Sequence, residues 1–383
     1  MAPLTSKQPF KALYTIFFLL KTPPQLILLY LKYLIKPFRP LKEWSATENL
    51  LSQIGKIMFQ YITATRSGLL LYADPVAAGD RHSHIEPAAE NLYSGVLTKS
   101  KDVKPGPVDA VWFPSAAPVR DADPAVLKKE KVVLHFPGGA YIMAFGHKDS
   151  GLEVADAMTK HMKADRTIWA QYRLSHSPET RFPAALQDTL TFYQYVLSLG
   201  FDPNNVILSG DSAGGNAVIA LLRYLEDRAH NEDVETQATL PLPGGAIVFS
   251  PWVNVTLNAG KEYDQYSNAQ CDCLWGPLLQ WGVDAFIPGE DLSSEVQSYI
   301  SPLHHPFKTS VPLVIHAGEA EAFYPDIKGF ADEMVELNGD RVQYHSTARA
   351  AHDILLSHKT FGLTEERAAV LESAREFFEH GSN

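Results

Sequence analysis

The sequence predicts an α/β protein with a mostly parallel central sheet and helices on both faces. Short apolar runs alternate with helix-like stretches along most of the chain, as in strands joined by crossover helices. At 383 residues, 45% apolar and 20% charged, the chain can bury a large core in one domain with a smaller appendage. The expected strands lie near 107–113, 131–136, 167–172, 205–209, 245–249, 311–317 and 342–346, and the clearest helices near 183–199, 214–229, 324–338 and 363–380.

The first 42 residues combine positive charge with apolar side chains. They contain seven Lys or Arg residues and no acidic residue, although the whole chain has a formal net charge of -11. Their two apolar runs, 12–20 and 26–35, are separated by Pro23 and Pro24. Each run is well short of the about 20 residues that span a bilayer, so we expect an arm that lies on a membrane surface rather than a transmembrane helix. The alternatives are a cleaved signal peptide and an arm packed on its own catalytic domain.

Residues 45–66 are expected to form an amphipathic helix. Their apolar side chains recur at helical spacing, at Leu50, Leu51, Ile54, Ile57, Met58, Tyr61 and Ile62. Further along the chain, His82-Ser83-His84 is interpreted as a solvated loop.

The strand expected at 131–136 runs into the turn Pro137-Gly138-Gly139-Ala140-Tyr141. Glycines just beyond a strand let backbone N–H groups point into a cleft, where they can stabilise a negatively charged oxygen. By itself this pattern also fits a simple Pro-Gly turn.

The run Gly210-Asp211-Ser212-Ala213-Gly214-Gly215 follows the apolar strand Val206-Ile207-Leu208 and begins a helix. A strand, a Gly-x-Ser-x-Gly turn and a helix form a nucleophile elbow. The turn leaves no room for a side chain two positions before or after the serine, so both positions require glycine. Ser212 is therefore the candidate nucleophile.

A serine nucleophile needs a base and a group that orients the base. The candidate base is His352, which follows the last expected strand; His345 and His358 are its nearest rivals. Three carboxylates compete for the orienting role after the strand at 311–317, namely Glu319, Glu321 and Asp326. Glu321 is preferred because small residues flank it and an apolar Phe323 follows. Glu319 is expected to be solvated, and Asp326 to cap a helix.

These residues together resemble one family. The chain is similar to hormone-sensitive-lipase-like α/β-hydrolases, the group that includes arylacetamide deacetylases. The resemblance covers roughly 108–360 and rests on Gly-Asp-Ser-Ala-Gly-Gly at 210–215, Tyr172-Arg173-Leu174 with Phe182-Pro183-Ala184-Ala185 and Asp188, Ser250-Pro251-Trp252, and Ser301-Pro302-Leu303. The order of serine, acid and histidine along the chain also matches.

The resemblance implies an α/β-hydrolase fold with a helical cap and a set of site residues. The implied triad is Ser212, Glu321 and His352, the implied oxyanion hole is formed by the amides of Gly139, Ala140 and Ala213, and the expected substrate contacts are Gly138, Tyr141 and Trp252. One motif departs from the family, because Pro137-Gly138-Gly139-Ala140 stands where His-Gly-Gly-Gly is usual. An alanine keeps its backbone donor if its φ is negative, but the missing histidine removes a side chain that would anchor the loop.

The expected organisation has three parts. Residues 1–42 form the membrane-associating arm, 43–105 a cap segment, and 106–383 the catalytic domain, with the aromatic-rich region 256–298 contributing to the cap. Both cap segments are expected to wall an apolar pocket. Asn254-Val255-Thr256 is a glycosylation sequon beside this cap.

The sequence therefore predicts a serine hydrolase that cleaves carboxylic esters of apolar small molecules, a carboxylesterase or lipase that needs no cofactor and no metal. Only two cysteines are present, Cys271 and Cys273, and they are poorly placed for a disulfide and lack a second half of a metal site. The expected partners are an ester substrate and a membrane surface, including the endoplasmic reticulum, with a cytoplasmic or secreted location as the alternative and no nucleic acid. A transacylase, cyclase or elimination catalyst of secondary metabolism is the main alternative, and a ligand-binding receptor on an inactive hydrolase fold the other.

Overall fold

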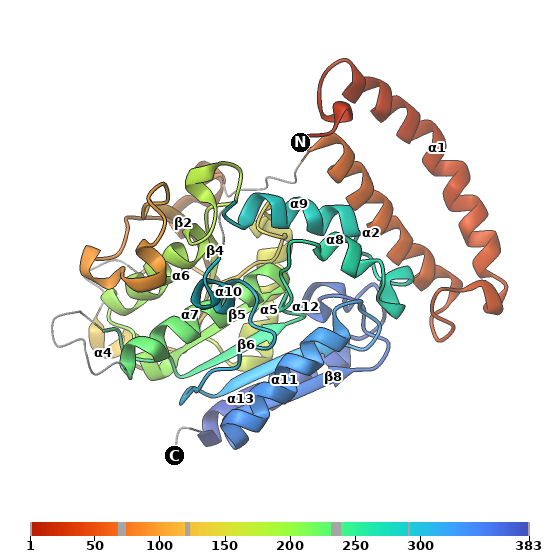
Figure 1. Cartoon of the computed structure of the whole chain (residues 1–383). Coiled ribbons are helices and arrows are strands. Elements are labelled where there is room, and N and C mark those ends of the chain that lie inside the picture. The colour runs from red at the N-terminus through yellow and green to blue at the C-terminus, as the bar shows by residue number, and fades with distance from the viewer. Residues whose placement is uncertain (1, 68–73, 119–122, 231–238, 290–291, 382–383) are drawn as a thin grey trace.

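The computed structural model describes residues 2–67, 74–118, 123–230, 239–289 and 292–381 (Figure 1). Its centre is one eight-stranded sheet with the strand order β1-β2-β4-β3-β5-β6-β7-β8. Only the pairs β1–β2 and β2–β4 are antiparallel. The strands are β1 (His82–Ile85), β2 (Val108–Phe113), β3 (Val132–Phe136), β4 (Arg166–Gln171), β5 (Val206–Asp211), β6 (Gly245–Phe249), β7 (Leu313–Gly318) and β8 (Val342–Thr347). All seven expected strands and the mostly parallel sheet are confirmed.

Strand β1 corrects the interpretation of His82-Ser83-His84 as a solvated loop. The segment pairs with β2, and the imidazoles of His82 and His84 lie 3.2 and 2.9 Å from a carboxylate oxygen of Asp109 on that strand. The edge strand has only one apolar residue, Ile85, so it lacks the alternation that would indicate a strand. The sheet therefore begins inside the segment 43–105 that was assigned to the cap.

Helices cover both faces of the sheet, and neighbouring strand residues point to opposite faces. Leu208 belongs to a core with α6, α7 and α11, whereas Ile207 belongs to a second core with α5, α12 and α13. The helices are α1 (Phe10–Tyr33), α2 (Ala46–Thr65), α3 (Pro75–Ala78), α4 (Pro124–Leu127), α5 (Leu152–Ala157), α6 (Ala184–Ser198), α7 (Ser212–Ala229), α8 (Ala259–Tyr263), α9 (Gly276–Phe286), α10 (Ser294–Ile300), α11 (Tyr324–Asn338), α12 (Ile354–Ser357) and α13 (Thr364–Gly381). The expected helices correspond to α2, α6, α7, α11 and α13.

The first two long helices form an antiparallel hairpin that projects from the sheet domain (Figure 1). Helix α2 begins with a capping box, in which the Ser45 hydroxyl accepts from the Glu48 amide and the Glu48 carboxylate accepts from the Ser45 amide. Helix α1 runs without interruption through Pro23 and Pro24, so the expected break between two short apolar runs is wrong. Packing along α2 supports the helix where each proline lacks a backbone donor.

The hairpin is fixed to the catalytic body through α2. The Gln53 side-chain amide donates to the carbonyl of Gln270 at 2.8 Å, and the Lys56 ammonium donates to the carbonyl of Ala269. At the other end of α2 the guanidinium of Arg66 lies 3.9 Å from the ring centroid of Trp281 on α9. Helix α2 therefore lies between α1 and the body.

Candidate active site

Ser212 lies at the sharp turn between β5 and α7. A Cβ atom at Gly210 would lie 2.5 Å from the carbonyl oxygen of Gly214, and one at Gly214 would lie 1.9 Å from the carbonyl oxygen of Phe136. Both positions therefore exclude a side chain, as the motif requires. Ser212 itself has a φ of 50°, a left-handed conformation that costs a residue other than glycine about 1–3 kcal/mol. The surrounding turn holds the serine in this strained geometry.

His352 and Glu321 are joined by a short hydrogen bond. The distance from His352 Nδ1 to Glu321 Oε2 is 2.7 Å, and the carboxylate is fully buried. A carboxylate in this position accepts the Nδ1 proton and leaves Nε2 unprotonated in the neutral ring. Ser212 and His352 line the same cavity, although no hydrogen bond joins these two described residues. In free enzymes such catalytic contacts are often longer than in substrate complexes.

The two competing carboxylates lie elsewhere. Glu319 is exposed and accepts a hydrogen bond from the Ser346 hydroxyl at 2.7 Å. Asp326 lies in the first turn of α11 but makes no capping hydrogen bond, which corrects its expected role. Its carboxylate instead accepts from the Tyr266 hydroxyl and from the Asn254 side chain, the latter at 3.0 Å. The asparagine of the sequon is thus engaged in a contact within the fold.

The loop after β3 approaches the serine, but its backbone differs from the expectation. Ala140 has a φ of 51°, so the condition that its φ is negative is not met. The loop is held as a turn in which the amides of Ile142 and Met143 donate to the carbonyl of Gly139 at 3.0 and 2.9 Å. Gly139 and Ala140 line the cavity together with Ser212. Ala213, the third expected donor, is the second residue of α7.

A cavity of about 230 Å³ lies in front of Ser212 and His352. Its other lining side chains are mainly apolar and come from α2, the loop after β3, the segment before α9, α9 itself and α12: Phe59, Met143, Phe145, Cys273, Leu274, Leu278, Leu279 and Leu356. The expected wall from both cap segments is present, since Phe59 lies in 43–105 and Leu278 in 256–298. Such a lining suits an apolar group of a small molecule.

Comparison with known proteins agrees with this fold. Residues 133–356 match the model of a family described by its alpha/beta hydrolase fold, and this segment is more than half of the chain. The chain belongs to the α/β-hydrolase family. Its resemblance to the hormone-sensitive-lipase-like group is confirmed, and the hydrolase is of the carboxylesterase type.

Two curated relatives and one solved structure illustrate the similarity. An acetyl-hydrolase of Streptomyces hygroscopicus is 28% identical over 226 residues, which are 59% of this chain and 68% of that protein. An esterase of Acinetobacter venetianus is 25% identical over 206 residues, 53% of this chain and 61% of that protein. The chain thus matches about two thirds of the length of these relatives. The structure of an esterase from the bacterial hormone-sensitive lipase family has a TM-score of 0.54 at 22% identity, covering 94% of this chain and 99% of that one.

Buried hydrogen bonds of Asp211 and His135 hold the loop that follows β3, and the sequence did not reveal them. Asp211 Oδ2 accepts from the Gly138 amide at 2.9 Å, and Asp211 Oδ1 lies 3.1 Å from His135 Nε2. Because a carboxylate only accepts, the imidazole donates through Nε2, while its Nδ1 lies 3.0 Å from the Ser209 hydroxyl. His135 lies on β3 two residues before Pro137, the position where the family has its usual histidine. A polar residue inside the apolar run 132–136 was the only signal of this anchor.

Ser250 is a second residue that the sequence left without a role. It is fully buried at the end of β6, with a φ of 44°. Its hydroxyl donates to Glu321 Oε1 at 2.9 Å and accepts from the Asp353 amide at the same distance. The Gly318 amide also donates to Glu321 Oε1, at 2.7 Å. Ser250 therefore ties the carboxylate to the backbone that carries His352.

Charge around His352 favours its protonated form. Burial lowers the pKa of this imidazole, but the hydrogen bond and negative charge of Glu321, with smaller contributions from Asp272 and Asp353, raise it to about 9. Asp353 also lines the cavity. Its burial, followed by the like charge of Asp211, raises its pKa well above the usual range.

Three expected substrate contacts lie outside the cavity lining. Tyr141 is 1% exposed, donates to Asn216 at 2.6 Å and stacks on Phe286 with ring centroids 3.8 Å apart. Trp252 is also 1% exposed and donates through Nε1 to the carbonyl of Asn254. The amide of Gly138 is occupied by Asp211. The polar atoms of these three residues are therefore bonded within the protein rather than directed into the cavity.

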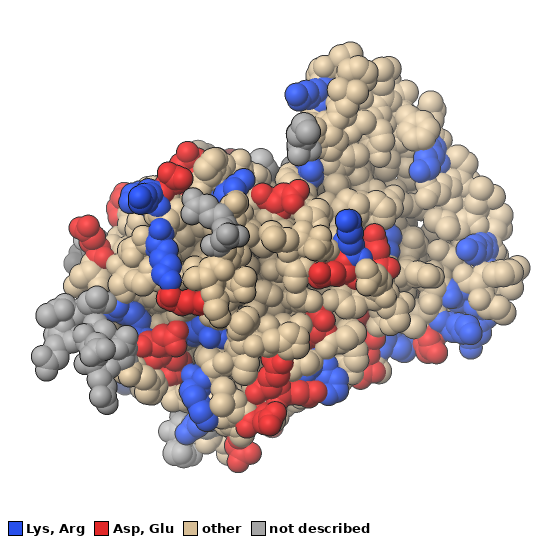
Figure 2. Space-filling view, in the orientation of Figure 1, with Lys and Arg blue, Asp and Glu red and all other residues tan. Residues whose placement is uncertain are grey.

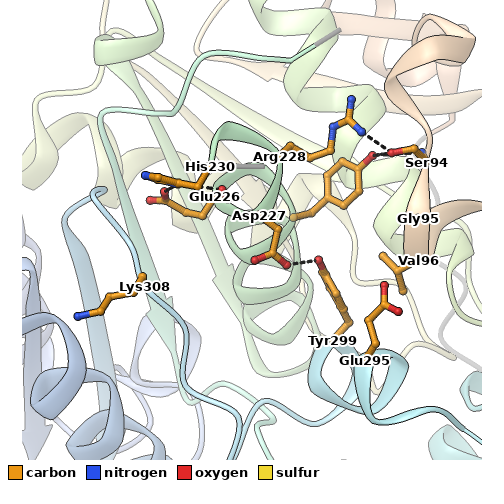
Figure 3. A pocket seen from close by; sticks show the side chains of 11 residues that line it. Ser94, Gly95, Val96, Glu226, Asp227, Arg228, His230, Glu295, Tyr299 and Lys308 are labelled. Atoms are coloured by element: carbon orange, nitrogen blue, oxygen red, sulfur yellow. Dashed lines mark hydrogen bonds and ion pairs between the residues drawn. The ribbon is translucent and has the colours of Figure 1, made fainter. Parts of the chain in front are cut away.

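A larger hollow of about 680 Å³ lies away from Ser212, between the end of α7, α10 and residues 94–96 (Figure 3). Its polar side chains are engaged in hydrogen bonds within the protein. Tyr299 donates to Asp227 at 2.6 Å, and Arg228 donates to the Ser94 hydroxyl. Buried Glu226 accepts from the Thr309 hydroxyl at 2.8 Å. This hollow contains none of the expected site residues. In the described part of the chain, no group of three or more His, Cys, Asp or Glu side chains could hold a metal ion.

Proposed function

We propose that the protein is a serine hydrolase that cleaves carboxylic esters of apolar small molecules through an acyl-enzyme on Ser212. The observation that carries the proposal is the 2.7 Å contact between His352 and Glu321 at the cavity that Ser212 also lines. A strained serine at an elbow, and an imidazole that lines the same cavity and is bonded to a buried carboxylate, are the parts that nucleophilic acyl transfer needs.

In the proposed mechanism Ser212 Oγ attacks the ester carbonyl carbon while His352 Nε2 accepts the hydroxyl proton. The tetrahedral intermediate then expels the alcohol, which takes that proton from His352. A water molecule, deprotonated by His352, attacks the acyl-enzyme, and the released serine oxygen regains the proton as the acid departs. Glu321 stabilises the imidazolium that forms in both steps, and the nucleophile, the base and the orienting carboxylate all belong to the chain.

The proposed oxyanion hole consists of the amides of Gly139, Ala140 and Ala213. Gly139 and Ala140 line the cavity, and Ala213 follows the nucleophile in the first turn of α7, where amides lack helical partners. Gly138 is left out because its amide already donates to Asp211. The left-handed backbone at Ala140 is the cost of this arrangement.

The proposed substrate is a small ester with an apolar acyl or alcohol part. The apolar lining supports this, including Phe59, Leu274, Leu278 and Leu279. The relatives named esterase and acetyl-hydrolase support ester cleavage as the reaction.

We further propose that the N-terminal arm attaches the enzyme to a membrane. Helix α1 has 24 residues, contains an 18-residue window with a mean hydropathy of 1.4, and is long and apolar enough to cross a bilayer, by length and composition alone. The seven cations of residues 1–42 would favour anionic headgroups.

The proposal is tested by labelling the full chain with a fluorophosphonate probe and locating the adduct by mass spectrometry. The adduct is expected on Ser212, with no labelling in Ser212→Ala. Labelling of another residue, or ester turnover by an unlabelled enzyme, contradicts the mechanism. Repeating ester turnover with excess short-chain alcohol separates hydrolysis from acyl transfer, because a transacylase would yield mainly the new ester.

A further inference from the structure

Helix α1 is apolar on its outward face as well as on the face that packs on α2. Its uncharged polar side chains Thr15, Thr22 and Gln25 are half-buried and lie toward the protein. The exposed stripe contains large apolar side chains at helical spacing: Leu13 (61% exposed), Ile16 (57%), Phe17 (56%), Leu20 (73%), Ile27 (62%), Leu28 (68%) and Leu31 (53%). A contiguous exposed apolar stripe of this length indicates an apolar environment outside the protein.

The surroundings of the stripe identify a lipid surface. Cations flank it near both ends, with Lys7 and Lys11 before or at the start of α1 and Lys32 and Lys36 at or beyond its end. A further exposed cation, Lys21, borders the stripe midway, with its Nζ 5.9 Å from the ring centroid of Phe17. In Figure 2 the projecting hairpin is mostly tan with blue atoms scattered over it. An apolar stripe bordered by Lys and Arg matches a bilayer in which anionic headgroups surround acyl chains.

The contacts of α1 show how it can meet a bilayer. Its inner face packs on α2, where the rings of Phe18 and Tyr61 have centroids 4.6 Å apart and Thr15 Oγ1 lies 2.9 Å from Tyr61 Oη. Before α1, the Thr5 hydroxyl donates to the carbonyl of Ala64 near the end of α2. After α1, the Leu41 amide donates to Asn49 near the start of α2, at 3.0 Å. Both ends of α1 are therefore tied to α2.

This arrangement is incompatible with a transmembrane α1. A helix of 24 residues is about 36 Å long and could cross a bilayer, but its two ends would then lie in different aqueous phases. Helix α2 runs beside α1 and is bound to the catalytic body by polar contacts of Ser52, Gln53 and Lys56. A spanning α1 would either leave α2 or draw these polar contacts into the membrane.

The cavity lies on the side of α2 that faces away from α1. Phe59 of α2 forms part of the cavity wall, and Cys273 and Leu274 follow the segment 269–271 to which α2 is bound. A surface on α1 is thus one helix away from the wall of the candidate active site.

We propose that α1 lies in the plane of a membrane as a one-sided anchor, and that the enzyme takes an ester dissolved in that membrane as its substrate. The proposal rests on the proposed esterase function and specifies where its substrate resides. The outward stripe enters the lipid, the flanking cations contact headgroups, and α2 holds the cavity near the membrane surface.

The first test measures binding of the full chain to vesicles of phosphatidylcholine with about 30% phosphatidylglycerol, by flotation. Leu20→Asn combined with Ile27→Asn is expected to lower the bound fraction at least about tenfold, because the two substitutions replace exposed apolar side chains of the stripe with polar amides. Leu257→Asn is the matched control, since Leu257 is 68% exposed but lies outside the hairpin. Unchanged flotation of the double variant would overturn the proposal. The proposal would also be overturned if the wild type did not bind vesicles and light scattering showed it to be a dimer while the double variant was a monomer.

The second test determines topology. The full chain, with one epitope tag at each end, is translated with microsomal membranes and treated with protease. An in-plane anchor leaves both tags on the same side, so both are protected or both are digested. Protection of only one tag would show a span and overturn the proposal.

The third test compares p-nitrophenyl acetate in solution with p-nitrophenyl laurate dissolved in the same vesicles. The double variant is expected to match the wild type on the acetate and to be at least about fivefold slower on the laurate. Equal loss, or no loss, on both esters contradicts delivery from the membrane. A wild type that cleaves neither ester contradicts the proposed function instead, so the two failures are distinguishable.

Discussion

The catalytic centre and the N-terminal hairpin differ in which side chains they bury and which they expose. At the centre, charged and polar side chains are buried, and the hydrogen bonds of Asp211, Glu321 and His135 offset the cost of removing them from water. On α1, apolar side chains such as Leu20 and Leu28 face outward while Thr15 faces the protein. The comparison teaches that the polar groups of the centre find their partners within the protein, whereas the apolar stripe on α1 stays exposed and is the basis of the proposed membrane contact.

The largest expected effect concerns the catalytic centre and is tested with Ser212→Ala. Ester hydrolysis is expected to fall by about 10,000-fold or more, because the acyl-enzyme can no longer form. Steady-state assays with a p-nitrophenyl ester measure the loss, and circular dichroism checks the fold. Ser298→Ala is the control and should leave the rate unchanged, because Ser298 is a half-buried residue of α10 outside the cavity lining. Wild-type turnover in a folded Ser212→Ala protein would refute the mechanism.

The next effect tests whether the buried carboxylate orients the base. Glu321→Gln is expected to lower kcat by about 1,000- to 10,000-fold, since an amide in this position disfavours the productive tautomer of His352. Asp326→Asn should change kcat less than about threefold, because its partners Tyr266 and Asn254 lie outside the proposed triad. The opposite order of losses would reassign the acid.

The pH profile measures the electrostatics of the same pair. His352 must be neutral to accept the serine proton, and Glu321 raises its pKa to about 9, so the neutral fraction grows with pH through that value. We expect kcat/KM to rise about tenfold per pH unit between pH 6 and 8 and to level off near pH 9. A plateau that begins near pH 6.5 would show that Glu321 does not stabilise the imidazolium in the free enzyme.

A smaller effect concerns the hydrogen bonds that Asp211 accepts from His135 and from the Gly138 amide. His135→Leu is expected to lower kcat about tenfold with little change in KM, because the hydrogen bond to Asp211 that orients the Gly138 loop is lost. His135→Gln can still donate to Asp211 and should recover part of kcat. Thermal unfolding of both variants provides the control. Equal kcat in all three proteins would assign His135 a structural role only.

The smallest expected effect tests whether the exposed stripe of the hairpin contributes to the stability of the fold. Leu20→Ala should change the free energy of unfolding by less than about 0.5 kcal/mol, since this side chain is 73% exposed. Leu208→Ala, in the fully buried β5, should cost about 2–5 kcal/mol. Urea titrations of the detergent-free protein compare the two. A large destabilisation by Leu20→Ala would mean that the stripe belongs to the protein core.

Local patterns in the sequence determined much of the fold and the identity of the candidate site. The apolar runs specified strands β2 to β8, and the glycines around Ser212 specified an elbow that excludes side chains at 210 and 214. Glu321 was distinguishable from Asp326 because its small and apolar neighbours indicated burial. These features are readable because each depends on residues a few positions apart in the chain.

Only the tertiary structure decided features that depend on distant partners. β1 forms by pairing with β2, and His135 acquires its role from Asp211 on β5. Tyr141 lies outside the cavity lining, with its ring stacked on Phe286 of α9. Helix α1 continues through Pro23 beside α2, and the structure shows which of its apolar side chains face α2 and which are exposed. Spacing along a chain gives the period of a helix, but the neighbour that packs against it determines which face is the interior.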